Sequence, residues 1–221
     1  MNLFLADLRA KARWCYQRED FRALLKTCAT DGTAAMLLYR LMQTSRRWRL
    51  EPLAMLFNKL NGIFCGCIIG RGADFGPGFV LIHSQGVVIN GNVRGGSEVH
   101  VEHQVTIGAE KNETPVLGNG LFIGAGAKIL GGITIGDGVR VGANAVVVKD
   151  VPAHVTVGGI PARILRHHSA KDDSADSPET APPALTDQDQ EQEQALRGST
   201  QQESSTQATA AQAAELSAAS R

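Results

Sequence analysis

The chain has 221 residues and carries 22 Lys and Arg against 22 Asp and Glu, so its formal net charge is zero. The charge is uneven, at +6 over residues 1–62, +1 over 63–168 and −7 over 169–221. The one basic cluster, "RRWR" at 46–49, is too short to indicate nucleic-acid binding, and no apolar run reaches the ~20 residues that a membrane-spanning helix needs. We therefore expect no nucleic-acid partner and no transmembrane segment.

Residues 1–62 are predicted to form a helical N-terminal region. Helical patterns of apolar residues cover 5–17, 20–29, 32–48 and 51–64. Asp20 and Asp31 stand where helix N-caps are expected, and Pro52 stands where the first turn of a helix tolerates proline. The basic residues recur at helical spacing, which is typical of a solvated helix face.

The cysteines indicate the compartment. Cys15, Cys28, Cys65 and Cys67 form no C-x-x-C pair, and the start of the chain lacks the apolar segment of a signal peptide. We expect free thiols and a cytoplasmic protein. The C-x-C of Cys65 and Cys67 has no second pair at zinc-site spacing, so we interpret both as small buried apolar residues.

Residues 63–168 repeat with a period of six. Counted from Ile69, every first position up to Val105 is aliphatic or phenylalanine, and the same phase resumes from Leu117 to Val147. Each unit is one short strand and a turn, which can bury its aliphatic side chain only by stacking on its neighbours. Three units per coil predict a mainly β fold, a left-handed parallel β-helix in which residues eighteen apart stack. A β-sandwich would instead show period-two alternation.

Residues 169–221 are rich in Asp, Glu, Gln, Ser, Ala and Pro and contain almost no large apolar residues. We predict that this tail is disordered, because it cannot bury enough apolar surface to offset the entropy lost on ordering.

His83, in "LIHSQGVVIN", is the third residue of its hexapeptide and is predicted to lie at a corner of the prism. In the eighteen-residue register its neighbours along the corner are Cys65 and Val101. A surface histidine on a turn is the ordinary interpretation. In a trimer, however, a corner faces the groove between two prisms, and imidazole is well suited to take a proton from a hydroxyl near neutral pH. We therefore predict that His83 is a general base.

The next coil carries two further histidines. The same register places His103 above Gln85, two residues out of step with His83, while His100 points elsewhere. Diverging imidazoles are weak evidence for metal, since a zinc site between subunits, as in the β-helical carbonic anhydrases, needs three that converge. We expect no metal site.

The irregular segment "GAEKNETPV" (108–116) replaces one side of a coil with a charged loop. Loops extruded from a regular scaffold commonly carry function. We expect this loop to act as a lid or as an arm that contacts the substrate.

The segments "FGPGFVLIHSQGVVIN", "VTIG", "LGNGLFIGAGAKILGGITIGDGVRVGANAVVVKDVP" and "VGGIPARIL", with the helical lead-in at 39–72, resemble the serine O-acetyltransferase group of hexapeptide-repeat acyltransferases. The resemblance covers roughly residues 32–166. Hexapeptides alone occur in many acetyl- and succinyltransferases. The lead-in combined with I-H-x-x-G and G-x-P-A-R is more specific.

The resemblance implies that acetyl-CoA donates an acetyl group to the hydroxyl of a small acceptor, in a homotrimer or a dimer of trimers. His83 matches the catalytic base of the family. By the same resemblance, the acceptor would be bound near His103, Glu113 and Thr114. Acetyl-CoA would lie between prisms, against residues of two kinds: backbone contacts at Gly108, Ala125 and Ala143, and phosphate contacts at Lys128 and Arg163.

Three positions depart from the family pattern. The aspartate that orients the base, fifteen residues before the histidine, is Ile68 here, and the aspartate directly before the histidine is Ile82. The loop's Arg-His pair, which engages an acceptor carboxylate, corresponds to Glu113–Thr114, a reversal of charge. The sequence does not identify a replacement for the orienting aspartate. Glu98 and Glu102 are candidates, with no specific argument for either.

Three functions therefore remain open. Acetylation of L-serine fits the overall pattern best. A sugar or other small alcohol as acceptor, as in relatives that acetylate polysaccharide precursors, fits the missing cationic pair. A catalytically silent β-helix that serves as an assembly scaffold fits the missing aspartate.

Overall fold

The computed structural model describes residues 3–168, so the predicted disordered tail lies outside the described residues. Four helices come first: α1 (Leu3–Tyr16), α2 (Phe21–Cys28), α3 (Thr33–Arg47) and α4 (Glu51–Cys65). They match the four predicted segments, and α4 continues to Cys65. Asp20 is the N-cap of α2, where its carboxylate accepts a hydrogen bond from the Ala23 amide, and Pro52 lies in the first turn of α4.

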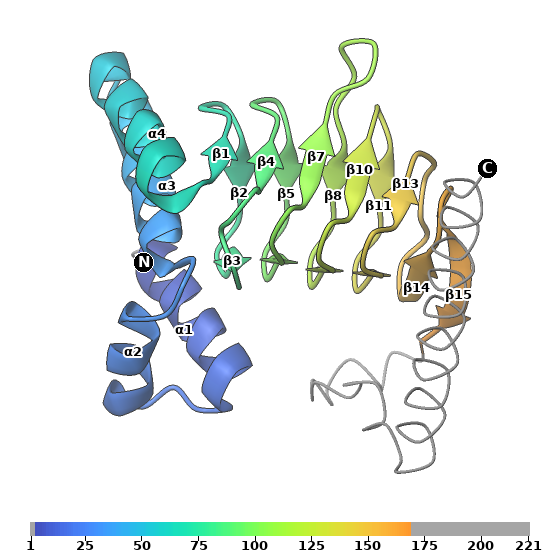
Figure 1. Cartoon of the computed structure of the whole chain (residues 1–221), viewed down its shortest axis with the longest axis horizontal. Helices are drawn as coiled ribbons and strands as arrows, with labels where there is room; N and C mark the ends of the chain where they lie inside the picture. Colours follow the sequence, from blue (N-terminus) through green and yellow to red (C-terminus); the bar gives the residue numbers. More distant parts are fainter. Residues whose placement is uncertain (1–2, 169–221) are drawn as a thin grey trace, which may run out of the picture. The chain divides into compact units, whose positions relative to one another are not determined.

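Up to residue 168, where the described part ends, fifteen short strands follow and form three sheets along the sides of a parallel β-helix (Figure 1). Sheet A contains β1 (Ile68–Ile69), β4 (Val88–Ile89), β7 (Thr106–Gly108), β10 (Lys128–Leu130) and β13 (Val146–Val147). Sheet B contains β2 (Asp74–Phe75), β5 (Arg94–Gly95), β8 (Val116–Leu117) and β11 (Thr134–Ile135). Sheet C contains β3 (Val80–Leu81), β6 (His100–Val101), β9 (Phe122–Ile123), β12 (Arg140–Val141), β14 (Val155–Gly158) and β15 (Arg163–His167), with β15 antiparallel to β14. The predicted parallel β-helix is confirmed.

The strand register departs from the predicted eighteen-residue spacing in several coils. Val101 and Ile123 are partners twenty-two residues apart across the loop at 108–116, and Val141 and Val157 are partners sixteen residues apart at the last coil.

The departure in the first coil decides the position of His83. Leu81 lies opposite Val101, twenty residues away, because the corner after Leu81 holds two extra residues. The inward residue of the next strand is therefore Ile89 and not Val87, although both are buried. A strand buries its inward residue and the residue two positions before it, and valine fills the earlier position throughout this coil. For that reason the two-residue shift leaves no trace in the hydrophobic pattern.

The helical region closes the end of the β-helix at which β1 begins (Figure 1). Met36, Tyr39 and Met42 of α3 are fully buried and join the core of the coils. The Tyr39 hydroxyl accepts a hydrogen bond from the Phe75 amide at 3.1 Å, so the core is joined to the first coil by polar contacts as well.

A buried ion pair fastens α1 and α3 to the first coil. Arg40 of α3 makes a two-point contact with the Asp7 carboxylate of α1, at 2.6 and 2.9 Å. Its guanidinium also donates to the Phe75 carbonyl, while the Asp7 carboxylate accepts from the Phe79 amide. Because Arg40 is 4% exposed and Lys11 is 0% exposed, the prediction of a solvated basic face is wrong for these two residues.

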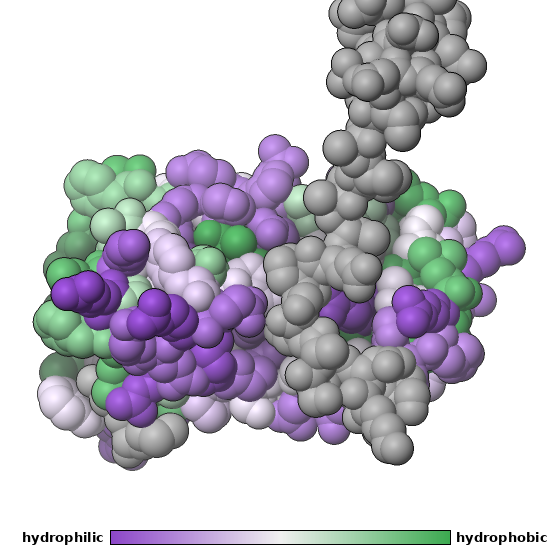
Figure 2. Space-filling model, turned by 90° about the horizontal axis from the view of Figure 1, so that it is seen from below, coloured by the Kyte–Doolittle hydropathy of each residue, from purple (hydrophilic) through white to green (hydrophobic). Residues whose placement is uncertain are grey.

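The outer faces of the sheets differ in how they are covered. Helix α1 lies over sheet C, where Trp14 stacks on Phe122 with ring centroids 5.3 Å apart and His100 is buried. On sheet A, Ile68 and Val88 are 55% and 40% exposed. Figure 2, a view from below, shows hydrophobic side chains exposed at the helical end of the molecule beside a broad hydrophilic area. No helix in the described part of the chain is both long and apolar enough to cross a membrane.

Candidate active site

His83 lies at the corner between β3 and β4, as predicted, but its neighbour along the corner is a different residue. Because Leu81 pairs with Val101, His83 lies over His103, two residues further along each strand. The two imidazole rings are 5.9 Å apart between centroids, in an edge-on arrangement. The expected stacking of His83 on Val101, and of His103 on Gln85, is therefore wrong.

Asp31 supplies the carboxylate that the sequence left unassigned. Its Oδ2 lies 3.1 Å from Nδ1 of His83, although the two residues are 52 positions apart. Its Oδ1 accepts from the Gly32 amide at 2.7 Å and from the Ser84 hydroxyl at 3.3 Å. The predicted N-cap role of Asp31 is wrong, because the N-cap of α3 is Gly32 and no side chain caps that helix.

The charge of Asp31 determines which nitrogen of His83 can act as a base. Partial burial raises the pKa of Asp31, but the hydrogen bonds from His83, Gly32 and Ser84 outweigh it and leave this pKa below its usual value. An ionised carboxylate accepts hydrogen bonds only, so Nδ1 of a neutral His83 carries the proton. Nε2 then holds the lone pair and can accept a proton from a hydroxyl.

The two glutamates considered from the sequence contact other histidines. Glu102 Oε2 lies 3.5 Å from Nδ1 of His103, without a hydrogen bond to it. Glu98 lies 3.6 Å from His100 and forms a 2.9 Å ion pair with Arg13. Neither glutamate orients His83.

A cavity of about 490 Å³ opens beside the two imidazoles. Its lining consists of an acid, amides, imidazoles and one glycine: Asp31, His83, Gln85, Gly86, His103 and Gln104. No lysine or arginine is among these lining residues. The cavity therefore offers a proton acceptor and several hydrogen-bonding groups, and its formal charge comes from Asp31.

Two of the five residues expected to contact acetyl-CoA continue the His83 corner. Ala125 and Ala143 follow His103 along it, since Val101, Ile123 and Val141 are successive partners in sheet C. The Gly126 amide donates to the His103 carbonyl at 2.9 Å, and the Asn144 amide donates to the Ala125 carbonyl at 2.8 Å. The corner is thus a continuous edge with imidazoles at one end and small side chains beyond them.

The other three residues lie beside this edge or away from it. Lys128 is on β10, and its Nζ donates to the Gln104 carbonyl at 2.5 Å, next to the cavity. Gly108 ends β7, opposite Leu130. Arg163 is exposed on β15, where it pairs with Gly158 at the outer strand of sheet C.

Two of the three residues expected to bind the acceptor do not line this cavity. The loop that carries Glu113 and Thr114 leaves the corner between sheets A and B, whereas His83 lies between sheets C and A. The Thr114 hydroxyl donates to the Asn92 carbonyl at 3.4 Å, and the amide of Glu110 donates to the carbonyl of Glu113 at 3.0 Å. Of the three, only His103 lies next to His83 within one chain.

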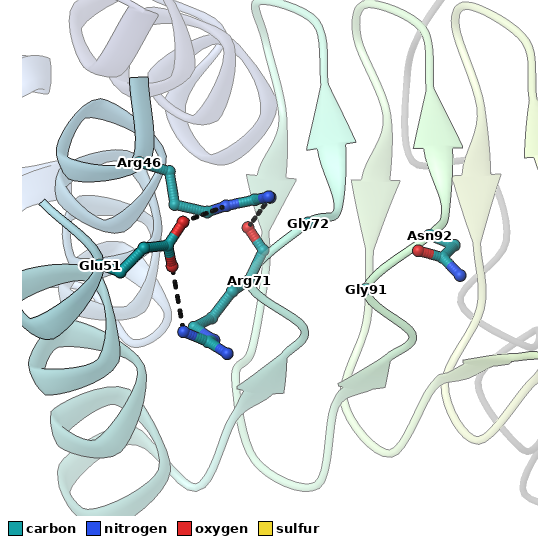
Figure 3. A pocket seen from close by; sticks show the side chains of 6 residues that line it. All are labelled: Arg46, Glu51, Arg71, Gly72, Gly91 and Asn92. Carbon is teal, nitrogen blue, oxygen red and sulfur yellow. Dashed lines mark hydrogen bonds and ion pairs between the residues drawn. The ribbon is translucent and has the colours of Figure 1, made fainter. Parts of the chain in front are cut away.

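A second cavity, of about 540 Å³, lies at that other corner near Asn92 (Figure 3). Glu51 bridges Arg46 at 3.4 Å and Arg71 at 3.1 Å, and Arg46 also donates to the Arg71 carbonyl. The contacts of these arginines hold the helices against the first coil. The lining of this cavity contains no histidine, cysteine or serine that could act as a base or a nucleophile. The cavity at His83 is therefore the candidate active site.

The sequence did not indicate that Asp31 contacts His83, nor that Lys11 is buried beside them. Lys11 is a fully buried lysine whose ammonium donates to the Asp31 and Leu81 carbonyls.

No group of three potential ligands among residues 3–168 is placed to hold a metal ion. The two buried cysteines, Cys65 and Cys67, are free thiols as predicted, and burial raises the pKa of Cys67 to about 12.

Known proteins identify the family. The family model described as "Bacterial transferase hexapeptide (six repeats)" matches residues 114–149. The serine acetyltransferase of Helicobacter pylori strain J99 is 38% identical over 138 residues, which cover 61% of this chain and 81% of that protein.

Two solved structures extend the similarity to the whole architecture. The serine acetyltransferase of Brucella abortus strain S19 in complex with coenzyme A has a TM-score of 0.67 at 30% identity, covering 74% of this chain and 68% of that one. The serine acetyltransferase of Neisseria gonorrhoeae in complex with serine has a TM-score of 0.65 at 30% identity, covering 72% and 67%. Because the Helicobacter protein is 38% identical and is matched over 81% of its own length, the chain belongs to the serine acetyltransferase family of hexapeptide-repeat transferases.

Proposed function

We propose that this protein transfers the acetyl group of acetyl-CoA to the hydroxyl of L-serine, with His83 as the general base. The observation that carries the proposal is the contact between Asp31 and Nδ1 of His83, which leaves Nε2 as a proton acceptor beside the cavity. Relatives named serine acetyltransferase, one of them solved with coenzyme A and another with serine, support the choice of both substrates. A scaffold without activity is the weaker alternative, since the orienting carboxylate is present after all.

The mechanism is a direct transfer. Nε2 of His83 takes the hydroxyl proton while the hydroxyl oxygen attacks the thioester carbonyl, giving a tetrahedral intermediate with a negatively charged oxygen. The C–S bond then breaks, and the imidazolium returns its proton to the departing sulfur. Asp31 stabilises the imidazolium between these two steps.

The corner edge supplies a path for the coenzyme. Ala125 and Ala143 continue the edge beyond the imidazoles, and their small side chains leave room for the pantetheine arm. Lys128 beside this edge and Arg163 at the outer strand carry positive charges that suit phosphates. Gly108, on the adjoining face of sheet A, is the remaining proposed contact.

We also infer a homotrimer in the cytoplasm. The loop with Glu113 and Thr114 and the His83 cavity lie at different corners of one chain, so a neighbouring copy is required for both to contact one acceptor. Exposed apolar side chains on sheet A, including Ile68 and Val88, suit burial between copies. The free thiols accord with a reducing compartment.

A neutral acceptor is the second candidate. The lining of the cavity holds Asp31 and no lysine or arginine, and the loop carries Glu113 where a cationic clamp would stand. An acceptor carboxylate would therefore lack a cationic partner within this cavity, whereas the hydroxyls of a sugar would find amides and imidazoles.

The decisive experiment is an acceptor screen with acetyl-CoA, in which release of the coenzyme thiol is followed. We expect turnover with L-serine, and turnover only with sugars would establish the second candidate. We expect His83→Ala to lower kcat by roughly 10²–10⁴-fold. Asp31→Asn should lower it by about tenfold, the low end for a hydrogen bond to a charged group, because Asp31 is half exposed. Full activity of His83→Ala on the acceptor found would show that another group is the base.

A further inference from the structure

Lys11 is a buried lysine of α1 that lies directly behind the candidate active site. Its side chain is fully buried, and its Nζ donates to three backbone carbonyls, those of Asp31, Leu81 at 2.7 Å and Ile82 at 3.4 Å. The first of these carbonyls belongs to the residue that orients His83, and the last belongs to the residue directly before His83. The ammonium therefore joins the two segments of chain that carry the Asp31–His83 pair.

The burial of this ammonium is costly, which argues against a role in packing alone. Burial lowers the pKa of Lys11 to about 8, even though the carboxylates of Asp31 and Glu102 lie near enough to oppose the shift. An apolar side chain of similar length would fill the same space without the desolvation penalty. A lysine at this position is explained by its hydrogen bonds to the Asp31, Leu81 and Ile82 carbonyls, which an apolar side chain could not make.

A close approach of the backbone at the same point supports this interpretation. Gly32, which follows Asp31, has a φ of 76° in the left-handed region. A Cβ atom built on Gly32 would lie 2.3 Å from the Leu81 carbonyl oxygen, which is one of the acceptors of Lys11. The chain therefore places glycine where the Asp31 segment meets the Leu81 segment and places an ammonium donor against both.

We propose that Lys11 is the positioning residue of this active site: it clamps the Asp31 segment to the Leu81–Ile82 segment and so fixes the Asp31 carboxylate on Nδ1 of His83. The proposal rests on the proposed function, because it assigns to Lys11 a role in the reaction that His83 would catalyse. Lys11 does not touch the substrates and acts only through Asp31 and His83.

A double-mutant cycle separates this role from a purely structural one. We would measure kcat and both KM values for the wild type, Lys11→Met, Asp31→Asn and the double variant. Lys11→Met should lower kcat by up to about tenfold, which is no more than the loss expected for Asp31→Asn, with the KM for acetyl-CoA unchanged within about twofold. In the Asp31→Asn background the same substitution should cost less than about twofold, because the carboxylate it positions is already gone. Lys59→Met, at an exposed lysine of α4, is the matched control and should leave activity unchanged.

Several outcomes would overturn the proposal. One is an unchanged kcat of Lys11→Met, and another is an equal loss in both backgrounds, which would indicate a general effect on the fold. Lys11→Gln, which keeps a donor, should retain more activity than Lys11→Met. If neither variant folds, as judged by circular dichroism, Lys11 belongs to the fold and not to the site.

A readout that needs no turnover keeps this test apart from that of the proposed function. In the wild type, ¹⁵N NMR of the His83 ring should show the proton on Nδ1 of the neutral ring, and Lys11→Met should lose this preference. If no acceptor is found for the wild type, the proposed function fails, while the NMR comparison still decides whether Lys11 positions the pair.

Discussion

At the scale of single residues, Asp31 gives His83 the carboxylate partner that the coils do not provide. The strand residue where the family's aspartate stands is Ile68, which is more than half exposed on sheet A and cannot bind an imidazole. A carboxylate from the turn between α2 and α3 reaches Nδ1 of His83 instead, at 3.1 Å. The proposed base is therefore held in the tautomer it would need, by a contact between two regions of the chain that are 52 positions apart.

Lys11 should also leave a signature in the pH dependence of stability. Burial lowers the pKa of Lys11 to about 8 in the folded protein from its ordinary value of 10.5, so the unfolded chain binds more protons than the folded chain between these pH values. The free energy of unfolding of the wild type should therefore rise with pH across this window, relative to Lys11→Met, by about 3 kcal/mol at most. Urea unfolding of both proteins at pH 7, 8.5 and 10 measures the difference. A constant difference across the three pH values would contradict it.

The residues show where sequence reasoning succeeds and where it fails. The corner position of His83 was predictable, because a period of six places it between two strands. Asp31 was not, because its partner lies 52 positions away and the pattern around it is that of a helix start. Lys11 was interpreted as solvated because helical spacing alone does not tell which face of a helix meets the coils.

At the scale of elements, α1 and α3 are held to the first coil by the buried pair of Asp7 and Arg40. The carboxylate accepts from the Phe79 amide as well as from the guanidinium, so Asp7 joins α3 to the first coil. Burial raises the pKa of Asp7, while the Arg40 guanidinium lowers it in part. Removing one partner leaves the other as an isolated buried charge.

We therefore expect Arg40→Met to lower the free energy of unfolding by about 3–5 kcal/mol, as is typical when a buried ion pair is broken. Arg13→Met is the matched control, since Arg13 is 46% exposed and its pairs with Glu19 and Glu98 lie at the surface. It should cost less than about 1 kcal/mol. Urea denaturation followed by circular dichroism compares the two, and equal losses would show that the Arg40 pair contributes no more than a surface pair.

The elements themselves were largely predictable, and their register was not. Four helices and a parallel β-helix follow from periods of 3.6 and six. The register shift after Leu81 was hidden because Val87 and Ile89 are both buried, so either could be taken as the repeating position. The position of His103 over His83 depends on this shift and became visible only with the strand pairing.

At the scale of the whole molecule, the outer faces of sheets A and B provide a test of assembly. Val88 on sheet A and Val116 on sheet B are 40% and 49% exposed, so they are matched in type and exposure. If copies pack through sheet A, Val88→Glu should break the trimer and abolish transfer, because a charge would be buried between copies.

Val116→Glu should leave the assembly of three copies intact. Analytical ultracentrifugation of the wild type should give three times the 23.5 kDa mass of one chain. The reverse result, in which only Val116→Glu dissociates the protein, would assign the interface to sheet B.

The turn that carries Asp31 makes the proposed activity depend on how the helical region is attached to the coils. The coils hold the imidazole and the small residues beyond it, but the acid that orients the imidazole arrives with the helices. Segments that open at a lower free energy than the core do so as units. A displacement of this turn alone would remove the Asp31 carboxylate from His83 and should lower the rate by about the tenfold expected of Asp31→Asn. Because Met36, Tyr39 and Met42 of α3 belong to the core of the coils, we expect the helices and the first coil to unfold together, so that activity and the β-helix are lost at the same temperature.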